Sequence, residues 1–298
     1  MAERLQRVSE VPKLPPRRRE GHKGEYGRVL IIGGSAGMIG APALASNAAL
    51  RGGAGLVTFA VPRTIQQAVA VICPCATSVP LDCDGESRLT PLAVRQAMTA
   101  AQRCDVLAVG PGMGVGAAQQ EMVAAALEQT QPLVIDADGL NNLARMDGWP
   151  ARRRCPLVLT PHPGEFSRLT GLSIEQVQAN RSQASIDALR KWTDGLTHED
   201  PTLVLVLKGA GTVVSNGRRI YINDTGNPGM ASGGSGDILT GLTAAMIGQG
   251  FEPFDAACLA VWLHGLAGDL AAAQLGEVSL MATDLLDYLP AATKGAVG

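Results

Sequence analysis

The segment from Asn227 to Asp237 joins a glycine-rich turn to a carboxylate, and it reads Asn-Pro-Gly-Met-Ala-Ser-Gly-Gly-Ser-Gly-Asp. An apolar run from Ile238 to Ile247 follows and predicts a helix that ends at Gly248. A helix that starts at such a turn leaves backbone N–H groups unpaired, and the helix dipole makes them a site for phosphate. Asp237 would stand beside that phosphate as a base for an attacking hydroxyl, so the segment indicates phosphoryl transfer.

An ordinary capped helix is the structural alternative for the same residues. Ser235 or Asp237 would then act as the N-cap, and the glycines would only supply the geometry of the turn. The rest of the chain must decide between the two interpretations.

Short β-branched runs alternate with Ala-rich helical patterns, which predicts βαβ units and a mainly parallel sheet between two layers of helices. The expected strands are 28–32, 56–61, 106–109, 133–136, 157–160 and 203–207, followed by a hairpin of 212–215 and 219–223 around Asn216-Gly217. The expected helices are 41–51, 91–102, 116–128, 174–191, 238–248 and 254–273. The fold class is therefore α/β, a three-layer α/β/α sandwich.

Glycine-rich or polar loops follow the strands at one edge of this sheet, where such folds bind ligands. They are 33–42, 110–114, 136–142, 160–165 and 208–212. Each loop alone is explained by turn formation. Together they favour a substrate cleft.

Several familiar motifs are missing. A dinucleotide fingerprint ending at Gly40 would need glycine at Ser35, and no lysine follows a glycine run as a Walker A motif requires. No serine nucleophile elbow occurs, and the histidines His22, His162, His198 and His264 lack metal-ligand spacing. A phosphate site with a carboxylate base is what remains.

Composition limits the class of protein. The hydrophobic fraction is 46%, and the net charge of −2 argues against nucleic-acid binding. No uninterrupted apolar run approaches ~18 residues, so no membrane span is expected, and residues 258–273 indicate a buried helix. The cysteines show no Cys-x-x-Cys pair, which indicates reduced thiols and a cytoplasmic protein.

The first 22 residues alternate basic and acidic side chains with prolines, and they predict a flexible basic leader. No linker or internal repeat interrupts the rest, so residues 23–298 are expected to form a single domain.

The ending Gly-Ser-Gly-Asp resembles that of the ribokinase-like superfamily, and the chain as a whole resembles its ADP- or ATP-dependent NAD(P)H-hydrate dehydratases. The motifs that carry this resemblance are 33–45, 48–58, 110–114, 136–141, 160–165, 208–212 and 227–237. Seven motifs in order make the match specific, and it extends from about Lys23 to Tyr288.

The resemblance implies nucleotide repair. In this family the S-epimer of hydrated NADH or NADPH is phosphorylated on its ring hydroxyl and then loses phosphate, which restores the reduced nucleotide. The chemistry is reasonable because phosphate is a far better leaving group than hydroxide and the ring nitrogen can expel it. Asp237 would take the hydroxyl proton, and the N–H groups of Gly234, Ser235 and Gly236 would form the anion hole.

The resemblance also implies binding roles by position in the motifs. Nucleotide contacts would come from Lys208, Gly209, Ala210, Gly211, Thr212 and Gly236. Contacts to the hydrated dinucleotide would come from Ala41, Gly112, His162 and Asp237. Without the resemblance, Lys208 is equally a strand-end lysine and His162 a turn histidine. Mg²⁺ is expected with the phosphoryl donor, and Asp136, Asp138 and Glu165 are only candidate ligands.

Further expectations concern the donor and the partners. Bacterial members of the family mostly use ADP and eukaryotic members ATP. Residues 208–212 do not by themselves fix the donor, but their spelling resembles that of bacterial members, so we expect ADP. Bacterial relatives often carry an epimerase domain, and we expect a separate epimerase because about 22 residues precede this domain. The family implies a homo-oligomer, a tetramer, while the sequence leaves both the oligomeric state and the choice between NADH and NADPH hydrates open.

Three other functions are weighed. A small-alcohol kinase of the same superfamily, acting on a thiazole or pyrimidine alcohol, would release a stable phosphate ester. A non-catalytic nucleotide sensor would not need Asp237, whose charge repels phosphate. An NAD-dependent dehydrogenase is disfavoured by the failed fingerprint.

Overall fold

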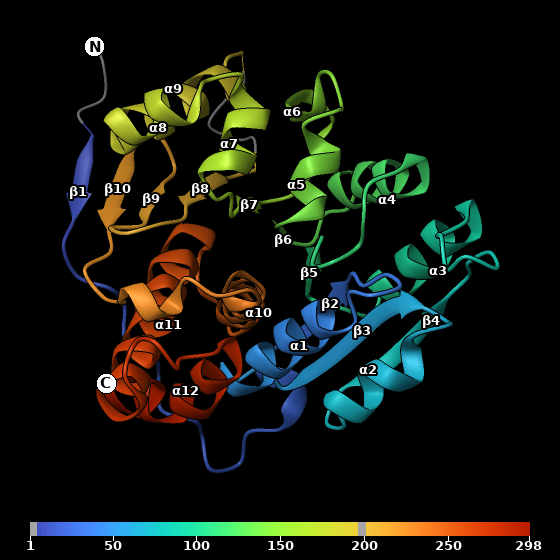
Figure 1. Ribbon diagram of the computed structural model, residues 1–298, viewed down its shortest axis with the longest axis horizontal. Helices are drawn as coiled ribbons and strands as arrows, with labels where there is room; N and C mark the ends of the chain where they lie inside the picture. The colour runs from blue at the N-terminus through green and yellow to red at the C-terminus, as the bar shows by residue number, and fades with distance from the viewer. Residues whose placement is uncertain (1–4, 196–200) are drawn as a thin grey trace.

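The computed structural model describes residues 5–195 and 201–298, so Arg4 of the leader and His198 lie outside the described residues. One ten-stranded sheet has the order β1-β10-β9-β8-β7-β6-β5-β2-β3-β4 (Figure 1). The strands are β1 Gln6–Val8, β2 Arg28–Ile32, β3 Leu56–Pro62, β4 Thr77–Leu81, β5 Val106–Val109, β6 Leu133–Ile135, β7 Leu157–Leu159, β8 Leu203–Leu207, β9 Val213–Ser215 and β10 Arg219–Ile222. Only β9 runs antiparallel to its neighbours, which confirms the expected mainly parallel sheet.

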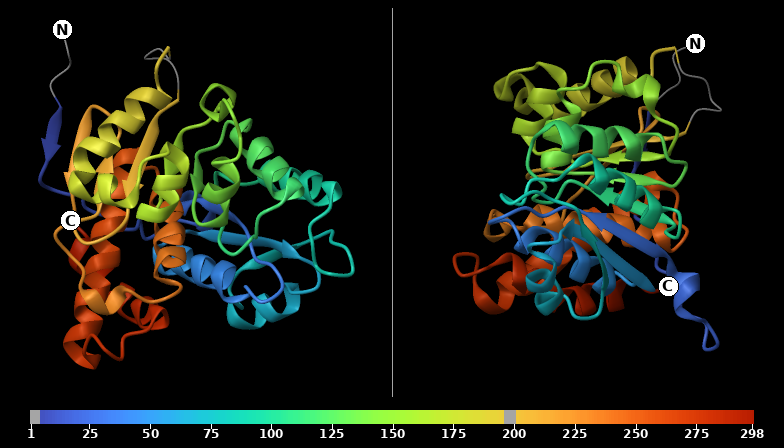
Figure 2. Two further views of the ribbon diagram at one scale, coloured as in Figure 1. Left: turned by 45° about the horizontal axis from the view of Figure 1, so that its top comes forward. Right: turned by 90° about the vertical axis from the view of Figure 1, so that its right-hand side faces the viewer.

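Helices cover both faces of the sheet, as Figures 1 and 2 show. One layer holds α1 (Gly40–Arg51), α2 (Gln66–Ile72), α10 (Ser235–Gly248), α11 (Pro253–Leu275) and α12 (Ala282–Ala296). The other holds α3 (Pro91–Ala101), α4 (Ala117–Leu127), α5 (Asp138–Leu143), α6 (Trp149–Arg152), α7 (Pro163–Thr170), α8 (Ile174–Ala179) and α9 (Arg181–Trp192). The 3₁₀ turns are η1 (Lys23–Tyr26) and η2 (Pro228–Met230). Each face of the sheet carries its own hydrophobic core, so the three-layer sandwich is confirmed.

The central strands are short runs of Val, Leu and Ile that are buried along their whole length, as strands covered on both faces must be. The chain leaves β2 in one direction, toward β3 and β4, and later returns to the other side of β2 with β5. The crevice between β2 and β5 is therefore a topological switch point, where sheets of this kind bind ligands.

The leader contains a strand that was not predicted. β1 pairs in parallel with β10, and the side chain of Leu14 is buried with its backbone joined to the C-terminal segment at Val297. Described residues 5–22 therefore lie along the domain, because their few apolar side chains find a sheet edge and a core to pack against.

The expected helix 174–191 is wrong as one element. It is divided at Asn180, whose side chain accepts a hydrogen bond from Gln183 N and caps α9 as a new helix. The sequence did not predict the strand β4 or the helices α2, α5, α6, α7 and α12. Most of these elements are short, and β4 and α12 contain a proline.

Helix α11 has the length and hydropathy of a membrane span, but 61% of its most apolar 18-residue window is buried in the fold. It packs between α10 and α12, which explains its apolar composition as that of a core helix. All six cysteines are free thiols, and four of them are buried.

Candidate active site

A pocket of about 840 Å³ opens at the carboxyl ends of the central strands. Its walls come from the loops after β6, β7, β8 and β10, from the first turn of α10, and from one face of α11. Of the residues implied by the family motifs, the pocket brings together His162, Lys208, Gly209, Ala210, Gly211, Thr212, Gly234, Ser235, Gly236 and Asp237.

The first turn of α10 has the geometry of an anion site. Its N-cap is Gly234, in the left-handed region at φ 97°, and no side chain caps the helix. The Ser235 hydroxyl instead donates to Met230 O (2.8 Å), so the capped-helix alternative is wrong. Ser235 N donates to Ser232 O at 3.4 Å, whereas within the described residues nothing accepts the N–H groups of Gly236 and Asp237. These two groups are free to bind a phosphoryl oxygen. Of the expected anion hole, the N–H of Ser235 is therefore engaged, and the N–H of Asp237, which was not predicted, is free.

Asp237 lies in this first turn with its carboxylate in an unusual environment. Burial, reinforced by the negative charge of Asp136 and opposed by the ammonium of Lys208, raises its pKa to about 7. A carboxylate with that pKa is matched to accepting a proton near neutral pH.

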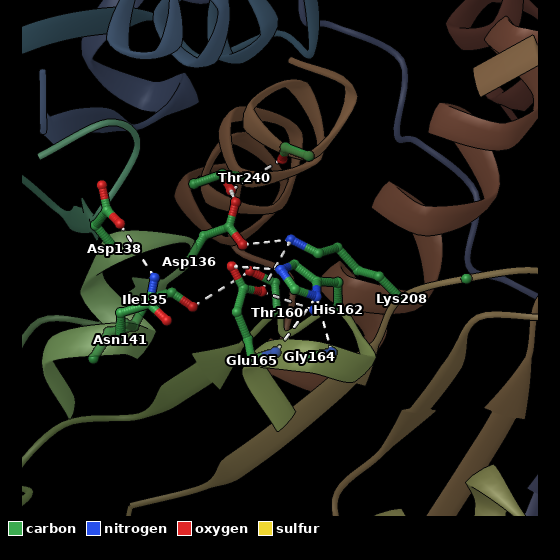
Figure 3. Close-up of polar contacts among 12 residues, drawn as sticks. Ile135, Asp136, Asp138, Asn141, Thr160, His162, Gly164, Glu165, Lys208 and Thr240 are labelled. Carbon is green, nitrogen blue, oxygen red and sulfur yellow. Dashed lines mark hydrogen bonds and ion pairs between the residues drawn. The ribbon is translucent and has the colours of Figure 1, made fainter. Parts of the chain in front are cut away.

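Lys208 is held by carboxylates at the end of β8 (Figure 3). Its Nζ lies 2.6 Å from Asp136 Oδ1 and 3.9 Å from Glu165 Oε2. Figure 3 shows the Lys208 side chain pointing toward Asp136 and Glu165. Burial alone would lower the pKa of Lys208, but these carboxylates outweigh it and raise that pKa, so the lysine is charged. The other oxygen of Asp136 accepts a 2.6 Å hydrogen bond from Thr240 of α10.

His162 caps α7 rather than standing alone. Its Nδ1 accepts from Gly164 N (3.0 Å) and Glu165 N (3.4 Å), and its backbone N–H donates to Glu165 Oε2. Burial and the nearby cations of Lys208 and Arg168 lower its pKa, so it is neutral, and Nε2 carries the proton because Nδ1 is an acceptor. Figure 3 shows the imidazole beside Glu165, whose own pKa burial raises to about 7.

The loop 208–212 requires its glycines. Gly209 and Gly211 have φ values of 138° and 62°, which side-chain-bearing residues rarely adopt. Thr212 closes the loop, since its hydroxyl donates to Gly209 O (2.9 Å). The loop therefore presents backbone atoms to the pocket.

Ala41 and Gly112 lie together at the β2/β5 switch point but do not line the 840 Å³ pocket. A Cβ atom on Gly112 would stand 3.1 Å from the Ala41 Cβ, and Ser35 Oγ donates to Gly112 O (2.8 Å). One turn beyond Ala41, Leu44 packs against Gly234, which links this region to the start of α10. The predicted contacts thus fall into two adjoining regions.

Two residues of the site were missed by sequence reasoning. Thr240 lies within the apolar run of α10, where a threonine is typical of a buried core face. His264, on α11, makes a 2.9 Å hydrogen bond from Nε2 to Ser235 O, and burial lowers its pKa to about 4, which keeps it neutral. The signal for both is a polar residue on the buried face of an apolar helix.

The candidate metal ligands offer little free capacity. Each oxygen of Asp136 has a partner, and both oxygens of Asp138 accept bonds, from Gly114 N and Asn141 Nδ2. No group of three possible metal ligands occurs within residues 5–195 and 201–298. This donor set fits an Mg²⁺ bound mainly by phosphates and water, not a metal held by a protein cage.

Comparison with known proteins agrees with the seven motifs. A family model described as NAD(P)H-hydrate dehydratase matches residues 29–291. The bifunctional NAD(P)H-hydrate repair enzyme Nnr of Moorella thermoacetica is 45% identical over 285 residues, which cover 93% of this chain and 51% of that protein. The chain spans about half the length of the curated relatives it matches.

Solved structures agree as well. The ADP/ATP-dependent NAD(P)H-hydrate dehydratase of Bacillus subtilis, co-crystallised with ATP/Mg²⁺, has a TM-score of 0.80 at 29% identity and covers 97% of this chain and 99% of its own. A ribokinase-like superfamily protein of Enterococcus faecalis has a TM-score of 0.77 at 27% identity, covering 98% of this chain and 96% of its own. The chain has the ribokinase-like fold and belongs to the NAD(P)H-hydrate dehydratase family.

Proposed function

We propose that this protein uses ADP to dehydrate the S-epimer of hydrated NADH or NADPH and so regenerates the reduced nucleotide. The observation that carries the proposal is the uncapped start of α10, where free N–H groups and the carboxylate of Asp237 meet at a pocket lined by loop 208–212. Family membership supports the same reaction.

Each step of the proposed reaction uses particular residues of the site. Asp237 removes the proton from the ring hydroxyl, whose oxygen attacks the terminal phosphorus of ADP. The bond from that phosphorus to the bridging oxygen breaks, and AMP leaves. The N–H groups of Gly236 and Asp237 hold the transferring phosphoryl beside the ion pair of Lys208 with Asp136. The ring nitrogen then expels phosphate, which breaks the carbon–oxygen bond and restores the dihydronicotinamide.

The two regions of the site suit two ligands. The nucleotide donor would occupy the 840 Å³ pocket beside Lys208, Gly209, Ala210, Gly211, Thr212 and Gly236. The hydrated nicotinamide would approach from the switch point, past Ala41 and Gly112, with His162 and Asp237 facing both ligands. Mg²⁺ would arrive with the donor phosphates and neutralise their charge.

The phosphoryl donor, the partner enzyme, the assembly and the location are proposed from the family resemblance. We infer ADP as the donor from the spelling of loop 208–212, with ATP as the second choice. We further propose action on hydrates delivered by an NAD(P)H-hydrate epimerase, a homotetrameric assembly and a cytoplasmic location, to which the free thiols are suited.

The test is recovery of NADH absorbance from purified NADH hydrate, with Mg²⁺ and either ADP or ATP. Recovery with ADP, together with released phosphate, supports the whole proposal, and recovery with ATP alone changes only the donor. Folded protein that binds nucleotide without recovering NADH would point to a small-alcohol kinase, and a stable phosphate ester would identify that kinase.

A further inference from the structure

Arg181, the first residue of α9, lies directly behind loop 208–212. Its Nη1 donates to Ala210 O and its Nη2 to Leu207 O, each at 2.6 Å. A Cβ atom on Gly209 would stand 2.8 Å from Nη1, so the guanidinium packs against the backbone of the loop. The loop therefore separates Arg181 from the pocket by the thickness of one peptide chain.

This guanidinium has no counter-ion in the described part of the chain. No carboxylate of residues 5–195 or 201–298 lies within 4.0 Å of it, and its buried Nε has no hydrogen-bond partner. Burial lowers its pKa, yet arginine stays charged at any physiological pH. An uncompensated cation in a partly buried place is costly unless something else balances it.

Lys208, in the same loop, cannot supply a net positive charge to the pocket. Lys208 bonds to Asp136 at 2.6 Å and also faces Glu165 and Asp237. One ammonium shared by three carboxylates leaves no net positive charge for an incoming polyphosphate. Arg181 lies against the loop, and no carboxylate of the described residues pairs with it.

We propose that Arg181 is the positioning residue of the nucleotide loop and the source of the positive potential that makes this pocket prefer nucleotides with more phosphates. The inference rests on the proposed function, since it takes loop 208–212 as the nucleotide site. Through the carbonyls of Leu207 and Ala210 the guanidinium holds the loop shape, while its charge acts across the loop on the phosphates.

The test measures the affinities of AMP, ADP and ATP by calorimetry in magnesium-free buffer. Arg181→Gln should weaken ADP binding roughly tenfold, with a smaller loss for AMP and a larger one for ATP, because the lost attraction grows with ligand charge. In the steady state, KM for ADP should rise while kcat at saturating ADP stays within about threefold, since Arg181 does not contact Asp237.

Arg153→Gln is the matched control. Arg153 is more buried than Arg181 and likewise donates to backbone carbonyls, those of Cys155, Pro201 and Thr202, but at the opposite end of β7 and β8. It should lower stability without changing the order of nucleotide affinities. Equal losses for AMP, ADP and ATP in Arg181→Gln, or a matching loss in Arg153→Gln, would overturn the inference.

Arg181→Lys covers the case in which Arg181→Gln does not fold. It keeps the charge and should keep the order ATP, ADP, AMP from tightest to weakest, so loss of that order in folded Arg181→Lys contradicts the inference. Wild-type protein that binds no adenine nucleotide would instead defeat the proposed function.

Discussion

Thr240 Oγ1 donates a 2.6 Å hydrogen bond to Asp136 Oδ2 and so joins helix α10 to the end of strand β6. The same carboxylate holds Lys208 Nζ through its other oxygen. Helix α10, which carries Asp237 in its first turn, and the loop 208–212 are therefore tied to one buried aspartate. The pocket is preorganised by this link and not by its loops alone.

Thr240→Val should destabilise the protein by about 1–3 kcal/mol, because the isosteric methyl group leaves a buried carboxylate oxygen without a donor. It should also weaken nucleotide binding through the loosened Asp136–Lys208 pair. Thr243→Val is the control, since Thr243 is equally buried on α10 and donates only to Leu239 O. Chemical denaturation would measure the free energy of unfolding of both variants. Equal losses in Thr240→Val and Thr243→Val would contradict the role of Thr240 in holding Asp136.

Asp237→Asn should lower kcat by about two to four orders of magnitude, because the attacking hydroxyl loses its base. Nucleotide affinity should be kept or improved, since a carboxylate that repels phosphate is removed. The NADH recovery assay and calorimetry measure the two effects separately. Turnover near that of the wild type would remove Asp237 from the mechanism.

The same substitution has a consequence for stability. The pKa of Asp237 in the fold is about 7, raised from 3.8, so the folded state holds this proton more tightly than the unfolded chain. The stability from this group is present below about pH 4 and is lost as the pH rises through 7. Asp237→Asn should therefore unfold at a higher temperature than the wild type at pH 8, and the gap should close toward pH 4. A gap that does not depend on pH would contradict the buried charge.

The pH dependence of kcat/KM should rise through an apparent pKa near 7, where Asp237 loses its proton. Glu165→Gln should move this limb to lower pH by a few tenths of a unit, because one neighbouring negative charge is lost. Glutamine can still cap α7, so the local fold is kept. Glu175→Gln, on the surface of α8, is the control and should not change the apparent pKa of kcat/KM. If Glu165→Gln does not lower that apparent pKa, a group other than Asp237 titrates.

Much of the fold was predictable because its elements are local. The buried strands 28–32, 106–109 and 203–207 and the helix before Arg51 are continuous apolar or periodic runs bounded by glycine or polar loops. The separation of α8 from α9 was not predictable, since only the capping bond of Asn180 ends one helix and starts the next. The strand β1 in the leader was not predicted, because a three-residue strand forms only when a partner edge exists.

The sequence by itself determined the α/β architecture, the family and the loops in which Asp237, Lys208 and His162 stand, because turn glycines, helix starts and motif order are properties of neighbouring residues. The tertiary structure decided how these groups are charged and held. Burial sets the pKa of Asp237. Contacts between residues 26 to 104 positions apart place Arg181 behind its loop, pair Lys208 with Asp136 and join Thr240 to Asp136. Burial and long-range contact are set by packing, which no local pattern encodes.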